Sequence, residues 1–165
     1  VFSDDIETVE VFFANNQILF RSEHISFYTR LLEGNYPDTD RLIPTEFNTE
    51  ATFNVANLRF AMERARLLSN ATQNGTVKLE FKNGVVSSHV HSPEVGRVNE
   101  EIDTSAVSGE DLSISFNPTY LIEALKAIDS EQVVIRFISS VRPFTLVPEG
   151  NEQGFIQLIT PVRTN

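Results

Sequence analysis

The sequence predicts an α+β fold in which a β-α-β-β-β unit occurs twice, with two helices packed on antiparallel sheets. One observation is a repeat: FNPTYLIEALKAI (116–128) matches FNVANLRFAMERA (53–65) at Phe, Asn, Leu and Ala positions, each 63 residues apart. Another is that each copy follows a short alternating run and precedes three further strand-like runs. Four matches at one offset, both at a helix start, indicate an internal duplication.

Both copies carry residues that begin a helix. Asn54 and Asn117 are expected N-caps, because an Asn side chain can accept from free N–H groups of the first turn. Pro118 follows at the first helical position, where its missing N–H costs nothing. The apolar residues of each helix share one face and are expected in the core. They are Val55, Leu58, Ala61, Met62, Ala65 and Leu68 in the first helix, and Tyr120, Leu121, Ala124, Leu125 and Ile128 in the second.

Phe60 and Leu67 of the first helix fall off this core stripe, and Arg59 and Arg66 form a basic flank beside them. Two interpretations are open. The two apolar side chains could form a second buried edge, or they could be exposed and make a subunit contact.

The strands are expected from alternating runs bounded by turn residues. Val9–Asn15, Gln17–Ser22 and His24–Leu32 indicate an opening meander without a helix, like the end of a preceding unit, and a linker should run up to Pro44. Asn83-Gly84 is a strong hairpin signal. The later strands are expected at 51–53, 76–81, 85–92, 95–103, 112–116, 133–137, 144–147 and 155–160, with the tail from Pro161 beyond the last sheet pairing. The chain starts without Met and enters a strand pattern at once, so we expect a piece of a longer chain.

Composition limits the possible classes of protein. The 165 residues carry a net charge of −10, which argues against a protein that coats nucleic acid through a uniformly basic surface. No apolar run approaches the roughly 20 residues of a membrane span. The absence of cysteine fits a cytoplasmic protein and excludes disulfides and thiolate sites.

The polar clusters do not predict catalysis. His89 and His91 alternate on one expected strand and face one side, with Glu94 nearby, but no third ligand of suitable type and spacing follows. The favoured interpretation is a solvated strand face, with no metal and no cofactor. Glu100, Glu101 and Asp103 form an acidic cluster near a strand end that lacks a basic partner in the sequence. It suits a charged strand edge or an ion-pair partner for another chain.

Three segments in combination resemble the bacterial DNA sliding clamp family, the beta subunit of DNA polymerase III. They are LLEGNYPDTDRLIP (31–44), FNPTYL (116–121) and LITPVR (158–163), and the resemblance covers the whole chain. It implies the DNA-clamp fold. It also implies that residues 1–44 are the C-terminal part of the middle domain plus linker, and that 45–165 are the C-terminal domain.

The resemblance implies a function without catalysis. A ring of two subunits would encircle duplex DNA without regard to sequence and give the polymerase processivity. The implied partners are the DNA polymerase III alpha subunit, the clamp loader and other proteins with clamp-binding motifs, and no membrane. The implied DNA-facing residues are Arg59, Arg64, Arg66 and Lys126. The implied interface of the full-length homodimer contains Phe60, Leu67, Leu68, Glu100 and Glu101.

The resemblance also implies a pocket that takes short peptides of the Gln-Leu-x-Leu-Phe type at the junction of the middle and last domains. Its implied residues are Pro37, Arg41, Leu42, Asn117, Tyr120, Val141, Pro143, Leu158, Thr160, Pro161, Val162 and Arg163. Thr160 and Val162 stand where longer Met side chains can occur in the family, so a shallower pocket is expected. Two alternatives stay open: a generic α+β interaction module without a DNA role, and a small enzyme using His89 and His91.

Overall fold

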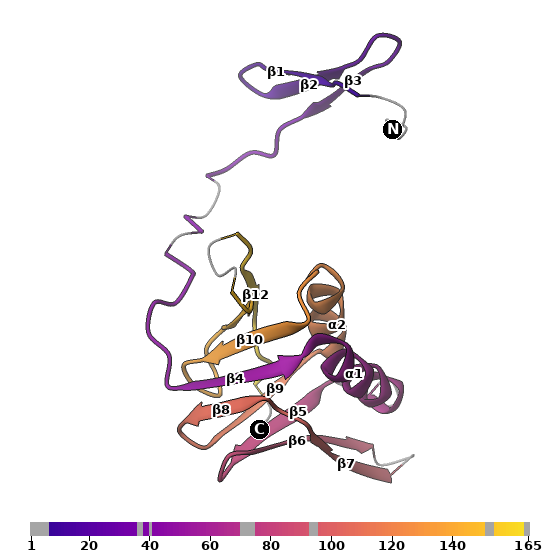
Figure 1. The fold of residues 1–165 in the computed structure, drawn as a ribbon. Coiled ribbons are helices and arrows are strands. Elements are labelled where there is room, and N and C mark those ends of the chain that lie inside the picture. Colours follow the sequence, from indigo (N-terminus) through magenta and orange to yellow (C-terminus); the bar gives the residue numbers. More distant parts are fainter. Residues whose placement is uncertain are drawn as a thin grey trace. The chain divides into compact units, whose positions relative to one another are not determined.

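The computed structural model describes residues 7–35, 38–39, 41–69, 75–92, 96–150 and 154–163. The chain forms two compact units, Val1–Thr39 and Asp40–Asn165 (Figure 1). The first is a three-stranded antiparallel sheet of β1 (Glu10–Phe13), β2 (Gln17–Arg21) and β3 (Ser26–Arg30), in that order. The predicted opening meander is thereby confirmed.

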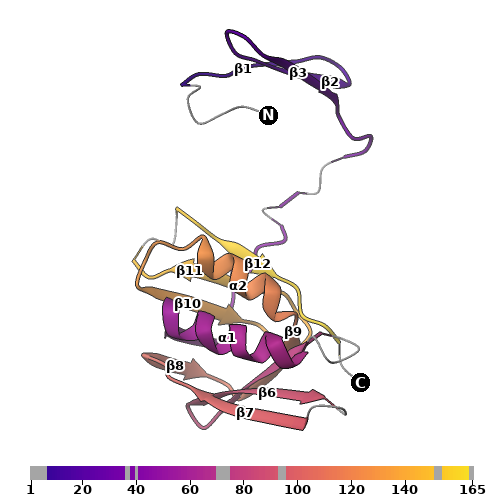
Figure 2. The same cartoon turned by 90° about the vertical axis from the view of Figure 1, so that its right-hand side faces the viewer.

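The second unit contains both helices and two antiparallel sheets. Its elements in chain order are β4 (Thr49–Asn54), α1 (Val55–Ser69), β5 (Val77–Lys82), β6 (Val85–Ser92), β7 (Gly96–Ile102), β8 (Ala106–Gly109), β9 (Leu112–Phe116), α2 (Pro118–Lys126), β10 (Gln132–Phe137), β11 (Phe144–Pro148) and β12 (Gln157–Ile159). The two predicted helices and the eight predicted strands of this unit are all found. α1 and α2 lie side by side against the sheets (Figure 2).

The two halves of the duplication exchange their opening strands. One sheet has the order β12-β11-β10-β4-β8 and the other β7-β6-β5-β9. β4, which precedes α1, therefore pairs with β10 of the second half, and β9, which precedes α2, pairs with β5 of the first. The repeat pattern in the sequence did not specify this exchange, in which each helix carries the chain from one sheet to the other.

β8 is a strand that the sequence did not predict. Its four residues, Ala-Val-Ser-Gly, lie at a sheet edge, and only Val107 is partly buried. So short and exposed a segment has no alternating pattern of burial to reveal it. At its end, Gly109 pairs with Thr49 and has φ +100°.

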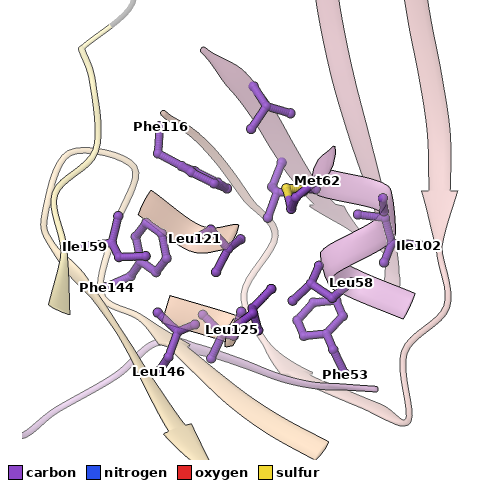
Figure 3. Close-up of a cluster of buried hydrophobic side chains, with 14 of the residues drawn as sticks. Phe53, Leu58, Met62, Ile102, Phe116, Leu121, Leu125, Phe144, Leu146 and Ile159 are labelled. Atoms are coloured by element: carbon purple, nitrogen blue, oxygen red, sulfur yellow. The ribbon is translucent and has the colours of Figure 1, made fainter. Parts of the chain in front are cut away.

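The core lies between the helices and both sheets, and residues from both halves meet there (Figure 3). Phe53 and Phe116, which occupy equivalent places in the duplication, are fully buried. The ring centroids of Phe116 and Phe144 lie 5.2 Å apart in an edge-on arrangement, a favourable geometry for aromatic pairs.

The predicted core stripes need two corrections. Tyr120 is 62% exposed, and Ile122 is buried in α2 instead. Tyr120 precedes Leu121 by one residue, about 100° around the helix, which turns it away from the sheets. In α1, Val55 and Leu68 are partly buried at the margin of the core rather than within it.

Candidate functional site

A hollow of about 520 Å³ lies between α2 and the last strand, β12. The helix side supplies Tyr120, Glu123, Ala124 and the C-cap residue Ala127. The strand side consists of Gln157, Leu158, Ile159 and Thr160. Apolar walls with a few polar groups at the rim are the usual composition of a site for a small ligand or a peptide side chain.

The first turn of α2 holds Tyr120 at this hollow. The Asn117 side-chain oxygen accepts a hydrogen bond from the Thr119 N–H at 2.9 Å, and Pro118 occupies the first helical position. The predicted N-cap is therefore confirmed. Because the cap fixes the start of the helix, the exposed ring of Tyr120 projects from a well-defined first turn.

The C-terminal segment runs beside the start of α2. The Val162 N–H donates to the Ser115 carbonyl at 2.7 Å, so the segment after β12 is held to the end of β9. The last sheet pairing of β12 is at Ile159, so the tail from Pro161 lies beyond it as predicted, but this hydrogen bond still holds the tail to β9. Pro143, before β11, lies near the same place, because the next residue, Phe144, pairs with Ile159.

The structure brings together only part of the predicted pocket. Tyr120, Leu158 and Thr160 line the hollow. Five other predicted residues do not line it, although each lies within a few residues of the lining or of the β11–β12 pair. They are Asn117, Pro143, Pro161, Val162 and Arg163. Arg41, Leu42 and Val141 do not line it either, and Pro37 lies outside the described residues.

Sequence reasoning missed five lining residues: Glu123, Ala124, Ala127, Gln157 and Ile159. Helical spacing could have found the first three, because they lie three, four and seven residues after Tyr120 and so share its face.

Two of the predicted DNA-facing cations are hydrogen-bonded to carboxylates, and a third, Arg59, makes a longer ion pair. Arg64 is bound to Glu100 by two hydrogen bonds, one of them between Nε and Oε2 at 3.3 Å. Hydrogen bonding to Glu100 raises the pKa of the Arg64 guanidinium above its ordinary value. Lys126 is paired with Glu123 at 2.9 Å. The Arg64–Glu100 pair joins residues that the sequence assigned to different surfaces, the DNA-facing one and the subunit interface.

Arg59 has a different environment. Its guanidinium lies 5.3 Å from the ring centroid of Phe60, which is a cation–π geometry. The nearest carboxylate contact is with Glu63 at 3.8 Å, and within the described part of the chain the buried Arg59 Nε has no hydrogen-bond partner. Among the described residues, the Arg59 Nε–H is therefore a donor without an acceptor, whereas the Arg64 Nε–H donates to Glu100.

The residues predicted for a subunit interface lie along α1 and β7. Phe60 is 48% exposed and Leu67 73% exposed, so the interpretation of these side chains as a second buried edge is wrong. Leu68 packs partly buried against the core. A smaller hollow of about 270 Å³ lies between α1 and β7, and its lining includes Phe60, Glu100 and Glu101.

The histidines are engaged by polar neighbours on the same sheet. His89 Nδ1 lies 2.8 Å from Asn99 Oδ1, and His89 Nε2 lies 2.9 Å from Ser87 Oγ. Arg97 Nε donates to His91 Nδ1 at 3.3 Å. Among the described residues, which do not include Glu94, no three His, Cys, Asp or Glu side chains are placed to hold a metal ion. No helix in the described ranges is long and apolar enough to cross a membrane.

Two helices on antiparallel sheets built from an exchanged duplication, with a hollow beside the second helix, define a clamp-type domain. Residues 40–163 match the family model of the DNA polymerase III beta subunit, C-terminal domain. The chain belongs to this family, the bacterial sliding clamps, and the family is that of a non-catalytic processivity factor of DNA replication.

Individual relatives agree with this assignment. The chain is 80% identical to the beta sliding clamp of Streptococcus pneumoniae serotype 4 over 165 residues, which is all of this chain and 44% of that protein. It is 56% identical to the beta sliding clamp of Lactococcus lactis, again over 44% of the relative. The crystal structure of the DNA polymerase III beta chain from S. pneumoniae TIGR4 superposes with a TM-score of 0.91, over 99% of this chain and 43% of that one. The sliding clamp of Bacillus subtilis, at 38% identity, gives a TM-score of 0.86 over 99% of this chain and 43% of that one.

Proposed function

We propose that this chain acts in a ring that encircles duplex DNA and tethers DNA polymerase III and other replication and repair proteins through short peptides. The chain spans less than half of the relatives it matches, so this is a proposal about the assembly in which the chain works. Within it, residues 1–44 are assigned to the end of a middle domain plus linker, and 45–165 to the C-terminal domain.

The hollow between α2 and β12 is the observation that carries the peptide-binding part. The exposed aromatic ring of Tyr120 lines it together with Leu158 and the small side chains of Ala124 and Ala127. A Leu or Phe side chain of a partner would bury apolar surface there, contributing about 1.5–3 kcal/mol for each anchor. The proposed peptide site comprises the twelve predicted residues, extended by Glu123, Ala124, Ala127, Gln157 and Ile159.

The DNA-facing part is assigned to Arg59, Arg64, Arg66 and Lys126. Because Arg64 and Lys126 already have carboxylate partners, contacts with phosphate would be few and weak. Weak contacts suit a ring that slides, since the phosphate term dominates affinity and carries no sequence information. The homodimer contact is assigned to Phe60, Leu67, Leu68, Glu100 and Glu101, because Phe60 and Leu67 expose apolar surface that the monomer does not bury.

A peptide titration tests the pocket. A fluorescein-labelled Gln-Leu-Ser-Leu-Phe peptide should bind the chain with about micromolar affinity, from two apolar anchors less the ordering cost of the peptide. Tyr120→Ala should weaken binding about tenfold or more, because it removes an exposed ring from the hollow. Fluorescence polarisation measures both values.

Phe60→Ala is the matched control, because it removes an exposed aromatic ring from α1, which does not line this hollow. Deleting residues 161–165 should also weaken binding. It removes the Val162–Ser115 hydrogen bond, worth about 0.5–1.5 kcal/mol of stability, so thermal melting is recorded alongside. Equal affinities of Tyr120→Ala and the unchanged chain would place peptide binding elsewhere, and no binding at all would favour the generic interaction module.

A further inference from the structure

We propose that Arg64 is a positioning residue of the subunit contact, where it neutralises Glu100 of its own subunit before the other subunit covers that carboxylate. This inference rests on the proposed function, because it explains how the homodimer contact assigned to α1 and β7 can be buried. It also gives a task at the subunit contact to a residue that the family resemblance placed on the DNA-facing surface.

Arg64 lies between the two exposed apolar residues of α1. Phe60 precedes it by four residues and Leu67 follows it by three, and residues at these spacings share one face of a helix. Phe60 is 48% exposed and Leu67 73% exposed. The Arg64 side chain therefore starts from the middle of the surface that we assign to the subunit contact.

Strand alternation directs Glu100 towards α1. Ile102 of β7 is buried in the core, and side chains two residues apart lie on the same face of a strand, so Glu100 faces the helix as well. Ser88, which is opposite Glu100 on β6, is also buried, whereas Glu101 is exposed. Because α1 contacts β7 (Figure 2), the Glu100 carboxylate lies beside the helix rather than in open solvent.

Arg64 binds both oxygens of this carboxylate. Its Nε donates to Oε2 at 3.3 Å, and its Nη2 donates to Oε1. A planar guanidinium matches a carboxylate in this two-point arrangement, which fixes the orientation of the pair as well as its charge. Both side chains line the hollow between α1 and β7, together with Phe60. The pair therefore lies directly beside an exposed aromatic ring of the proposed contact.

A carboxylate at this place must be neutralised if the surface is to be covered. Removing a charge from water costs free energy that only a partner charge in good geometry offsets. Arg64 supplies that partner in advance, while the pair is still partly open to water, with 57% of the Arg64 side chain and 28% of the Glu100 side chain exposed. An ion pair so exposed contributes little to folding. Its effect is therefore expected on association, when the pair loses water.

Dissociation of the full-length dimer tests this inference, measured as the loss of energy transfer between fluorophore-labelled subunits on dilution. Arg64→Gln should raise the dissociation constant about tenfold or more, because Glu100 then has no cation when the contact closes. The double variant Arg64→Gln, Glu100→Gln should return to within about threefold of the unchanged protein, because the unpaired charge is gone. Arg64→Lys should lie between, since it keeps the charge but not the two-point geometry.

Arg66→Gln is the matched control. It removes the same charge from the same helix, but Glu100 is paired with Arg64 and not with Arg66, so the dissociation constant should not change. Circular dichroism spectra compare the folding of all variants. Arg64→Lys serves as the readout if Arg64→Gln loses its fold.

An unchanged dimer with Arg64→Gln would overturn the inference. A tighter dimer would overturn it too, because Glu100 would then bind a cation of the other subunit and Arg64 would compete for it. Failure of the double variant to recover would show that the loss does not come from an unpaired carboxylate. Leu67→Ala separates this inference from the proposed function. If it weakens the dimer and Arg64→Gln does not, the contact stands and only the inference falls; if neither does, both fall.

Discussion

Gly109 has backbone geometry and surroundings that exclude a side chain. Its φ is +100°, and a Cβ placed there would lie 2.0 Å from the Asn48 carbonyl oxygen. Gly109→Ala should therefore destabilise the fold by more than the about 1–3 kcal/mol expected for backbone strain alone, because the backbone contact must also open. Urea unfolding of the variant measures the loss.

Gly96→Ala is the matched control, since Gly96 has φ +110° and, among the described residues other than its chain neighbours, no atom lies within 4 Å of the position that an added methyl group would take. It shares the backbone strain but lacks the clash. If the two variants lose equal stability, the close approach of Gly109 to Asn48 contributes nothing and the explanation is wrong.

Single residues were predictable where local chemistry decides their role. Asn117 followed by Pro118 defines a helix start without reference to the rest of the fold, and the hydrogen bond to Thr119 confirms it. Tyr120 was placed in the core because it is largely apolar and lies near the stripe, but its exposure depends on how α2 is rotated against the sheets. That rotation is a property of tertiary packing and is not encoded in helical spacing alone.

At the scale of the element, α1 presents two kinds of leucine. Leu58 is 1% exposed and packs in the core, whereas Leu67 is 73% exposed. Leu58→Ala should cost about 2–5 kcal/mol of stability, and Leu67→Ala should cost less than about 0.5 kcal/mol. Thermal and urea unfolding of the 165-residue chain separate the two.

The same Leu67→Ala change in the full-length protein should weaken dimerisation, which sedimentation measures. An unchanged dimer would exclude Leu67 from the subunit contact, and a large loss of stability in the chain would mean that Leu67 is buried after all.

The elements were predictable to within a few residues wherever a strand is half-buried or bounded by turn residues. The Asn83-Gly84 turn is an example, with φ values of 51° and 78° at its two residues, as the primed hairpin turns require. β8 and the exchange of strands between sheets were not predictable. β8 has no burial pattern, and the choice of β10 rather than β5 as the partner of β4 depends on long-range packing, which local periodicity cannot specify.

For the candidate site, sequence and family resemblance predicted Tyr120, Leu158 and Thr160, which line one hollow. The place of β12 at the end of its sheet was beyond prediction. It depends on the order of strands in a sheet assembled from both halves of the duplication.

At the scale of the whole molecule, net charge opposes DNA binding by this chain alone. The chain carries −10, and three of the four proposed DNA-facing cations, Arg59, Arg64 and Lys126, form ion pairs with carboxylates. We expect no complex with a short duplex at sub-micromolar concentration in about 150 mM salt, because phosphate contacts weaken steeply with salt. An electrophoretic mobility shift assay checks this.

A repeat of the assay at about 20 mM salt serves as the comparison, since any inner-face attraction should become visible only there. Tight binding at the higher salt concentration would contradict the proposal that the protein holds DNA by enclosing it.

The exchange of β4 and β9 between the two halves has a consequence for the order of folding during synthesis. β4 can pair with β8 as soon as residue 109 is available, but its other neighbour, β10, is completed only at Phe137. Phe53, near the end of β4, is fully buried in the finished fold, and it cannot reach that state until β10 has formed beside β4. Because such distant pairings are slow to form, neither half can mature on the ribosome before the other. The two copies of an ancestral unit thus became a single cooperative folding unit, which is completed from its C-terminal end.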